Sequence, residues 1–405
     1  MKKYLSSFFQ LFEKNMQRFS SDRQDAWEDL NSLDFEKAKE NYPYLPLENL
    51  FSEDLRLAEK KEIEIEKDLK GLVFIDGFFA KDISEIPTNV LINPLAKASF
   101  FKKKEFFSLL NFVFHSEQTV IHIPAKTKLK EPIEITYYFS NQAEKRLVFP
   151  KILVTLGEEA EAEFHFSIKT KTSQLPLSFS PSFEVILEKD SKLSCYSNLD
   201  SFSSIQCFDL YHFMLHENAN LHFFDFSKIG SLRYLQGWVD LLGKHSKASL
   251  ESAVLLDKNF QNHMNFYVNH EAKKTISSQK HKSILLDEAK SSLRGDVFIA
   301  SDAEESSSSQ VNHNLLLSDT AFVYSQPKLR IFNDNVKATH GATVSQLKDD
   351  ELFYLESRGM DKVQAKQLLM KAFAIEMIDF VKDNRIKEKV RTNISQYLEK
   401  AGFNG

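Results

Sequence analysis

The sequence predicts a mainly β protein, with a long stack of short strands between a helical N-terminal region and a helical C-terminal region. Short runs of alternating apolar and polar residues follow one another from about residue 71 to residue 335, and no helical segment of ten or more residues separates them. One eleven-residue segment recurs 31 residues later. The chain has 36 phenylalanines and 11 glycines, which favours an extended interior of stacked aromatic side chains over tight hairpins.

Residues 1–70 form the predicted N-terminal helical region. Apolar residues recur there at three- and four-residue spacing, the pattern of an amphipathic helix. They are Phe8, Phe9, Leu11, Phe12, Met16 and Phe19. Pro43 and Pro46 interrupt this pattern, and residues 48–70 then continue as a charged helix or linker.

Residues 71–335 form the predicted β core, with opening strands in 71–114 and coils in 115–335. Residues 151–157 and 162–168 alternate as half-buried strands do. The segment 277–287 recurs as 308–318, with two serines, a glutamine and two leucines at identical positions. A repeat at this spacing indicates successive coils of a β-solenoid, each burying its face against the next. A sandwich of short strands remains the alternative.

Residues 336–405 form the predicted C-terminal helical domain. Asp349 or Asp350 caps a short helix that ends at Gly359 in a left-handed cap. Asp361 and Gln364 form a capping box for the next helix. That helix carries an apolar stripe, which docks either on its own domain or on a partner. The stripe consists of Ala365, Leu369, Phe373, Met377 and Phe380.

The charge and cysteine content exclude several classes of protein. With 52 basic and 57 acidic residues, the chain lacks the clustered cations of a duplex-binding protein. Cys195 and Cys207 are too few for a disulfide framework and are expected as buried thiols in a reducing compartment. Glu13 and Lys14 interrupt the N-terminal apolar patch too early for a secretory signal, and the uncharged run 106–114 is about half a membrane span. These features predict a cytoplasmic protein.

The nearest approach to a nucleotide motif is the segment 237–245. A P-loop needs four residues between its glycines and a serine or threonine after its lysine. Here five residues separate Gly237 from Gly243, and His245 follows Lys244. We therefore expect this chain to bind no nucleotide.

The most specific signal is a block that contains His340. Residues 336–344 read Val-Lys-Ala-Thr-His-Gly-Ala-Thr-Val, and residues 352–359 read Leu-Phe-Tyr-Leu-Glu-Ser-Arg-Gly. Taken alone, His340 and Gly341 suggest a turn between the β region and the helices. The block is long and gap-free, however, and it resembles SufD, a family of scaffold subunits of the SufBCD iron–sulfur cluster assembly machinery. Weaker similarities lie in 72–87, 120–133, 269–297 and 314–331.

The resemblance implies a right-handed parallel β-helix and a non-catalytic scaffold rather than an enzyme. It implies a heterodimer with SufB, with a homodimer as the alternative for the isolated chain, and docking of the SufC ATPase on the C-terminal helices. The SufC-docking residues implied are Arg358, Gly359, Ala365, Leu369 and Phe373.

The resemblance also implies that His340 binds iron or a nascent iron–sulfur cluster, held transiently and shared with SufB. Imidazole is a competent iron ligand of intermediate softness, and Gly341 would let the backbone turn closely beside the partner.

The block departs from the family at three positions. Many relatives carry cysteine where Ala338 stands, an acidic residue at Arg330 and glycine at Ser345. The change at Ala338 removes a second soft ligand and leaves His340 without a neighbouring thiol. The paralogous SufB fits less well, because it would carry cysteine in its late coils and glutamate after the motif histidine.

Two other functions compete with the scaffold. β-Solenoids also include carbohydrate-active enzymes, whose sites need clustered acidic and basic residues on an exposed sheet; the sequence offers no evident cluster. The second is an adaptor that has lost cluster chemistry, which Ala338 makes plausible.

Overall fold

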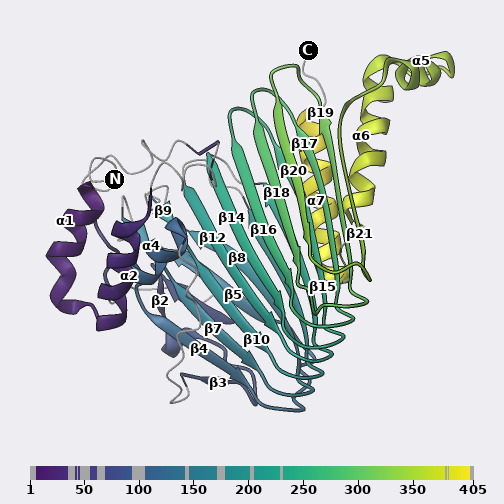
Figure 1. Cartoon of the computed structure of the whole chain (residues 1–405). Coiled ribbons are helices and arrows are strands. Elements are labelled where there is room, and N and C mark those ends of the chain that lie inside the picture. Colours follow the sequence, from purple (N-terminus) through teal and green to yellow (C-terminus); the bar gives the residue numbers. More distant parts are fainter. Residues whose placement is uncertain are drawn as a thin grey trace.

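The β region forms two long, mostly parallel sheets that face each other across a shared interior (Figure 1). The computed structural model describes residues 6–34, 42, 44–45, 55–61, 69–93, 105–141, 146–170, 178–200, 205–228, 231–378, 381 and 383–401. For most of its length the chain alternates between the two sheets, so that each pair of strands adds one coil to a stack. This parallel β-solenoid, with helices at both ends, confirms the predicted mainly β fold and excludes the sandwich.

The first sheet has ten strands among the described residues, in the order β2-β1-β5-β8-β11-β13-β15-β17-β19-β21. Its strands are β1 (Leu72–Ile75), β2 (Phe78–Phe79), β5 (Ile133–Phe139), β8 (Glu161–Thr170), β11 (Lys192–Asp200), β13 (Asn220–Lys228), β15 (Lys247–Leu256), β17 (Ile276–Leu285), β19 (Ser307–Leu316) and β21 (Lys337–Gln346). Only β1 and β2 pair antiparallel in this sheet, as far as the structure describes it.

The second sheet runs in the order β20-β18-β16-β14-β12-β10-β7-β4-β3, and β6 and β9 pair beside it. Its strands are β3 (Leu91–Ile92), β4 (Gln118–Ile123), β6 (Leu147–Val148), β7 (Lys151–Leu156), β9 (Ser178–Phe179), β10 (Ser182–Leu187), β12 (Gln206–Leu215), β14 (Leu232–Leu241), β16 (Gln261–His270), β18 (Lys290–Ile299) and β20 (Phe322–Ile331).

The two copies of the repeated segment lie one above the other, in successive coils of the solenoid. They lie in β17 and β19, where Ser277 pairs with Ser308, Gln279 with Gln310, and Leu285 with Leu316. The two serine hydroxyl oxygens are 2.8 Å apart in a hydrogen bond. The sequence echo therefore predicted both the coil length and the register at this point.

Residues other than glycine form tight corners between the coils. Asp190 and Asn218 have φ angles of 59° and 57°, in the left-handed region that aspartate and asparagine tolerate best after glycine. The next residue is buried and small, Ser191 or Ala219, and its N–H donates to the carbonyl three residues earlier at 3.1 Å. The low glycine content thus excludes glycine hairpins but not these corners.

Aromatic rings fill the interior between the sheets. Phe164, Phe183 and Phe223 are almost completely buried. The Phe164 and Phe183 rings meet edge-on across the interior, with centroids 5.4 Å apart. Burying one such side chain contributes about 1.5–3 kcal/mol, so the abundant phenylalanine stabilises the stack as the composition indicated.

Helices cover the outer face of the second sheet at the N-terminal end of the solenoid (Figure 1). They are α1 (Ser6–Asn15), the short 3₁₀ turn η1 (Met16–Arg18), α2 (Ser21–Ser32) and α4 (Phe106–Phe114); a second 3₁₀ turn, η2 (Lys81–Ile83), follows β2. Phe8, Leu11 and Phe12 are buried as the stripe predicted, whereas Met16 is exposed. The Phe12 ring stacks on Trp27 with centroids 4.4 Å apart.

Two details of the predicted N-terminal half need correction. The segment 71–114 contains strands only in its first part, and its end is helix α4, whose apolar residues are buried against both the other helices and the sheet. An all-apolar run does not distinguish a buried strand from a buried helix. Of the predicted helix or linker 48–70, residues 55–61 are irregular apart from a bridge at Leu57, and most of the rest lies outside the described residues.

The β region extends past the predicted boundary at residue 335. Strand β21 follows it and pairs with β19 at ten successive positions. The β-branched residues Thr339, Thr343 and Val344 suit such a strand. The helices begin only afterwards, with α5 (Asp349–Ser357), α6 (Lys362–Ile378) and α7 (Asn384–Ala401).

The predicted cap of α5 at Asp349 or Asp350 is wrong, because α5 begins after Lys348, which makes no side-chain cap bond, and both aspartates lie inside its first turn. The other two predicted caps at the C-terminal end are confirmed. Gly359 has a φ of 91°, directly after the end of α5. The Gln364 N–H donates to Asp361 Oδ1 at 2.8 Å, and the Asp361 N–H donates to Gln364 Oε1 at 3.2 Å.

Helices α6 and α7 pack on the outer face of the first sheet. The buried residues of α6 are Ala365, Met370, Ala374, Met377 and Ile378. The last four pack in one cluster with outward-facing sheet residues such as Phe224, Leu255 and Ile284. Leu369 and Phe373 of the predicted stripe lie half-buried at its edge, and Phe380 lies outside the described residues. A strict four-residue spacing advances about 40° per step around a helix, so it drifts off the buried face.

One buried cation fixes α6 to the sheet. Lys282 of β17, whose side chain is buried, forms an ion pair with Glu376, and its ammonium lies 4.5 Å from the centre of the Phe373 ring.

No helix in the described part of the chain is long and apolar enough to cross a membrane.

Candidate functional site: the open end of the solenoid

The last strand of each sheet has an open edge at the C-terminal end of the solenoid. β20 pairs with β18 and β21 pairs with β19, and neither has a second partner strand among the residues described. Most side chains of both strands are exposed or half-exposed. A long regular edge is a template for adding a strand from another chain.

His340 belongs to a row of side chains that points into the solenoid. Residues paired across a parallel sheet share a face, and His340 pairs with Gln310, which pairs with Gln279. The row continues through preceding coils as Leu250, Phe223, Cys195 and Phe164. Those four residues belong to the buried core. His340 is exposed because no coil follows it, so its imidazole lies at the mouth of the interior.

The interior near this mouth is polar. A small cavity there is lined by Gln279, His281, Gln310, Asn312, Ser325 and Gly341, among others. Burial lowers the pKa of His281 to about 3, so its ring is neutral. Both polar atoms of the Gln310 amide are buried without a hydrogen-bond partner among the described residues. Such groups bind water or a polar ligand when one is present.

The structure corrects the expected turn at His340 and Gly341. Both residues lie in the middle of β21, and Gly341 does not have a positive φ. A Cβ added to Gly341 would meet nothing within 4 Å, and the alternation of β21 places it on the opposite face from His340. Ala338 lies two residues before His340 on the same face, packed against the core.

Arg330 on the other edge strand has its own carboxylate partner. Its Nε donates to Asp296 of β18 at 2.9 Å, and its guanidinium lies 5.3 Å from the centre of the Phe298 ring. Arg330 is therefore held within the chain, half-exposed beside the open edge.

The predicted docking residues fall into two groups. Ala365 is fully buried, and Leu369 and Phe373 are half-exposed. Arg358 and Gly359 are exposed, and the Arg358 guanidinium lies 5.4 Å from the centre of the Tyr354 ring. The same helices carry exposed apolar side chains, namely Phe353, Tyr354, Val363, Leu368 and Ile375, which are 42–73% exposed.

The sequence of this chain is similar to iron–sulfur cluster assembly proteins. Residues 138–373, more than half of the chain, match the family described as SUF system FeS cluster assembly, SufBD core domain. The chain belongs to the SufB/SufD family. A SufBD family protein of Synechocystis is 28% identical over 92% of this chain and 90% of its own length. SufD of Escherichia coli is 33% identical over 39% of this chain and 37% of its own length. The chloroplastic protein ABCI7 of Arabidopsis thaliana is 25% identical over 80% of this chain and 69% of its own length.

A buried charge network crosses the interior of this SufB/SufD family member. Arg233 of β14 donates from two guanidinium nitrogens to the two oxygens of Asp225 on the opposite sheet, at 2.8 Å each. Its Nε donates to Asp209 of β12, and all three side chains are completely buried. Cys207 donates from Sγ to Asp209 at 3.2 Å. The network links the two sheets at a depth that solvent does not reach.

Both cysteines of this family member are buried. Burial, followed by the charge of Glu163 for Cys195 and of Asp209 for Cys207, raises their pKa well above the ordinary thiol value. Each therefore stays a neutral thiol, as predicted for buried structural cysteines, and neither is poised to accept sulfur.

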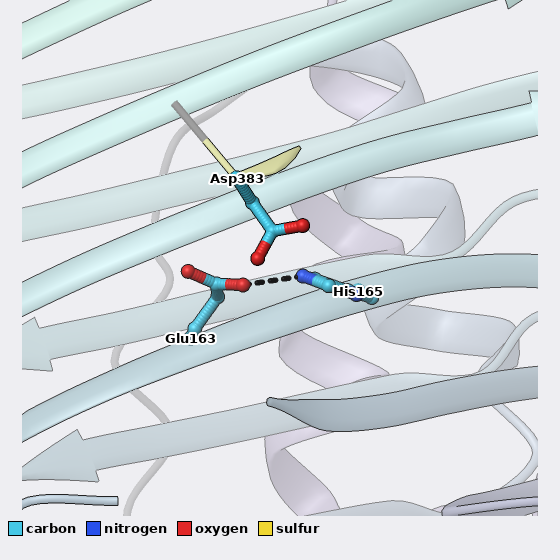
Figure 2. Close-up of side chains that lie close together, drawn as sticks. All are labelled: Glu163, His165 and Asp383. Carbon is cyan, nitrogen blue, oxygen red and sulfur yellow. Dashed lines mark hydrogen bonds and ion pairs between the residues drawn. The ribbon is translucent and has the colours of Figure 1, made fainter. Parts of the chain in front are cut away.

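A second polar cluster lies where the solenoid meets the C-terminal helices (Figure 2). Glu163 and His165 project from β8, and Asp383 precedes α7. His165 Nε2 is 2.6 Å from Glu163 Oε1, and its Nδ1 is 3.1 Å from Glu134 Oε1. Our sequence analysis missed this cluster. The alternation of β8 places Glu163 and His165 on one face, but no sequence pattern places Asp383 beside them.

His165 carries a proton on both ring nitrogens at neutral pH. Burial alone lowers its pKa, but the hydrogen bonds and charges of Glu134 and Glu163 outweigh that effect and raise the pKa to about 9. Arg385 adds a second cation, with contacts of 3.0 Å to Asp383, 3.1 Å to Glu131 and 3.7 Å to Glu163. The cluster joins the solenoid to the turn between α6 and α7.

Proposed function

We propose that this chain is the SufD-type scaffold subunit of a cytoplasmic SufBCD complex, on which an iron–sulfur cluster is assembled as cargo. The observation that carries the proposal is the open end of the solenoid, where an exposed edge strand presents His340 at a polar mouth. In this proposal SufB adds its own strands to the edges of β20 and β21. His340 then lies inside the joined solenoids, where its imidazole serves as a ligand for iron or the nascent cluster.

Ala338 limits the side chains that this subunit can offer as iron ligands beside His340. The side chain two residues from His340 on the same face is a methyl group, so it adds no soft ligand. Both cysteines lie deep in the core as neutral thiols. In the proposed complex this subunit supplies one imidazole, and the thiolates come from SufB.

A proline in the edge strand tests the pairing with SufB. The Lys337 N–H donates inward to Ser306 at 3.0 Å, so by the two-residue period of a strand the Ala342 N–H points outward. Ala342→Pro would remove that outward donor and obstruct an incoming strand without loss of a ladder bond to β19. We expect its affinity for SufB to fall at least about tenfold in pull-down or calorimetric titration, with Ala342→Ser as the control. Equal affinity of the two variants would exclude pairing through this edge.

The apolar surface of α5 and α6 is the proposed docking site for SufC. Leu368 and Ile375 are seven residues apart, so they lie on one side of α6, and they are 42% and 56% exposed. Tyr354 and the stacked Arg358 continue this surface onto α5. The proposal keeps Arg358 and Gly359 from the predicted set and adds the exposed apolar residues.

A charge on this surface tests the docking of SufC. Leu368→Asp should lower the affinity for SufC at least about tenfold, because an aspartate at a desolvated interface loses its hydration. The melting temperature should stay within a few degrees, since Leu368 is exposed. Lys389→Asp places the same group at an exposed position of α7, outside this surface, and serves as the control. Unchanged SufC binding by Leu368→Asp would locate the docking site elsewhere.

A further inference from the structure

We propose that Glu163, His165 and Asp383 bind a divalent first-row transition-metal ion at the junction between the solenoid and the C-terminal helices. Figure 2 shows the three side chains pointing toward one another, two from β8 and one from the turn before α7. One donor atom from each lies within 4.8 Å of the other two. This site is separate from His340, which lies on the interior face of β21.

The donor spacing suits a metal ion after a small adjustment. Typical metal–nitrogen and metal–oxygen distances of about 2.0–2.2 Å place neighbouring ligand atoms roughly 3 Å apart. His165 Nε2 and Glu163 Oε1 are 2.6 Å apart with a proton between them. An ion that replaces this proton therefore requires these two atoms to separate by well under 1 Å.

Glu134 orients the imidazole for this role. Its Oε1 accepts a hydrogen bond from His165 Nδ1 at 3.1 Å, which leaves Nε2 directed at Glu163. Metal-binding histidines commonly donate their other ring N–H to a carboxylate, which fixes the ring and makes the ligating nitrogen more basic. Tyr196 packs edge-on against the His165 ring, with centroids 5.4 Å apart, so the imidazole is already positioned.

Only one carboxylate oxygen of Asp383 accepts the backbone N–H groups that cap α7. Its Oδ1 accepts the N–H groups of Arg385 and Ile386 at 2.8 and 3.0 Å and so begins α7. Its Oδ2 contacts the Arg385 guanidinium at 3.0 Å. An ion would use Oδ2 without loss of the cap.

The charges around the site favour a divalent cation. The carboxylates of Glu131, Glu134, Glu163 and Asp383 face two cations, His165 and Arg385. Arg385 competes for the site, but it is half-exposed and keeps its pair with Glu131 when it leaves Glu163 and Asp383 Oδ2. One imidazole nitrogen with carboxylate oxygens is a donor set for manganese, iron, cobalt or zinc as divalent ions rather than for copper(I).

Titration of the full chain with Co²⁺ tests the site, read by calorimetry and by visible absorbance. The His340→Ala background removes the histidine of the proposed assembly site. We expect one bound ion in that background, and at least about tenfold weaker binding after His165→Gln or Asp383→Asn. Asp383→Asn keeps a good helix cap and so carries the test if His165→Gln folds poorly. Glu304→Gln, whose carboxylate pairs with Lys273 and with none of the residues of the site, should bind as tightly as its parent.

Thermal unfolding supplies a second measurement. Because the ion joins β8 to the turn before α7, saturating Co²⁺ should raise the melting temperature of the His340→Ala chain but not of its Asp383→Asn derivative. Co²⁺ binding that survives Asp383→Asn unchanged, that disappears on His340→Ala alone, or that is undetectable in the full chain would overturn the proposal. The first two outcomes would assign the ion to other ligands, and the third would leave an ion-paired junction without a metal. None of these outcomes bears on the pairing with SufB.

Discussion

The Arg233→Met variant is expected to lose about 3–5 kcal/mol of unfolding free energy, the cost typical of breaking a buried ion pair from one side. Arg233 holds two aspartates, one on each sheet, and all three side chains are completely inaccessible to solvent. Methionine fills a similar volume, so the loss comes from charge rather than from a cavity. Asp209 and Asp225 would then have to remain ionised without a counterion or bind protons at neutral pH.

Urea unfolding followed by far-ultraviolet circular dichroism measures this loss. The matched control is the triple variant Arg233→Met, Asp209→Asn and Asp225→Asn, which removes both buried anions together with the cation. It should recover most of the lost stability, because the large cost arises from unpaired charges. If Arg233→Met alone is as stable as the wild type, the network contributes nothing to holding the two sheets together.

His340→Ala is expected to reduce cluster formation in the reconstituted complex at least about tenfold while the chain stays folded. The side chain is exposed, so its removal costs little packing. Its position at the end of an interior row makes it the imidazole that an added coil would enclose. The measurement is anaerobic reconstitution with SufB, SufC, iron, a cysteine desulfurase and ATP, scored by visible absorbance and bound iron.

His313→Ala provides the matched control for His340→Ala. His313 lies on the neighbouring strand β19, is not fully buried, and hydrogen-bonds Thr343 at 2.7 Å. Its place in the alternation of β19 puts it on the opposite face of the sheet from the His340 row. The complex that contains the His313→Ala chain should therefore form clusters in normal yield. A normal yield from His340→Ala as well would leave this chain a scaffold without a ligand.

The repeated features of the fold were predictable because they are local and periodic. Ser277 and Ser308 stand 31 residues apart in the sequence and pair in the structure, so the echo gave the coil length directly. The capping box of Asp361 and Gln364 needs only four consecutive residues and was equally visible. A resemblance over the block around His340 indicated the family, which the similarity over residues 138–373 shows.

The remaining features depend on contacts that one sequence does not encode locally. The segment 106–114 is apolar throughout and fits a strand as well as the helix it forms. His340 and Gly341 suggest a turn, but the long pairing of β21 with β19 overrides that preference. Asp383 approaches Glu163 only because α6 and α7 fold back along the outer face of the first sheet.

The composition of the interior row has a consequence for how the molecule unfolds. Phenylalanine, cysteine and leucine side chains occupy the row from Phe164 to Leu250, and amide and imidazole groups occupy it from Gln279 to His340. In a stack where each coil contacts only its neighbours, stability is a sum of local terms. The final coil has a neighbour on one side and little apolar area to bury, so fraying of the isolated chain starts there. A partner that extends the stack would therefore do more than bind a finished surface, since it would complete the folding of that last coil.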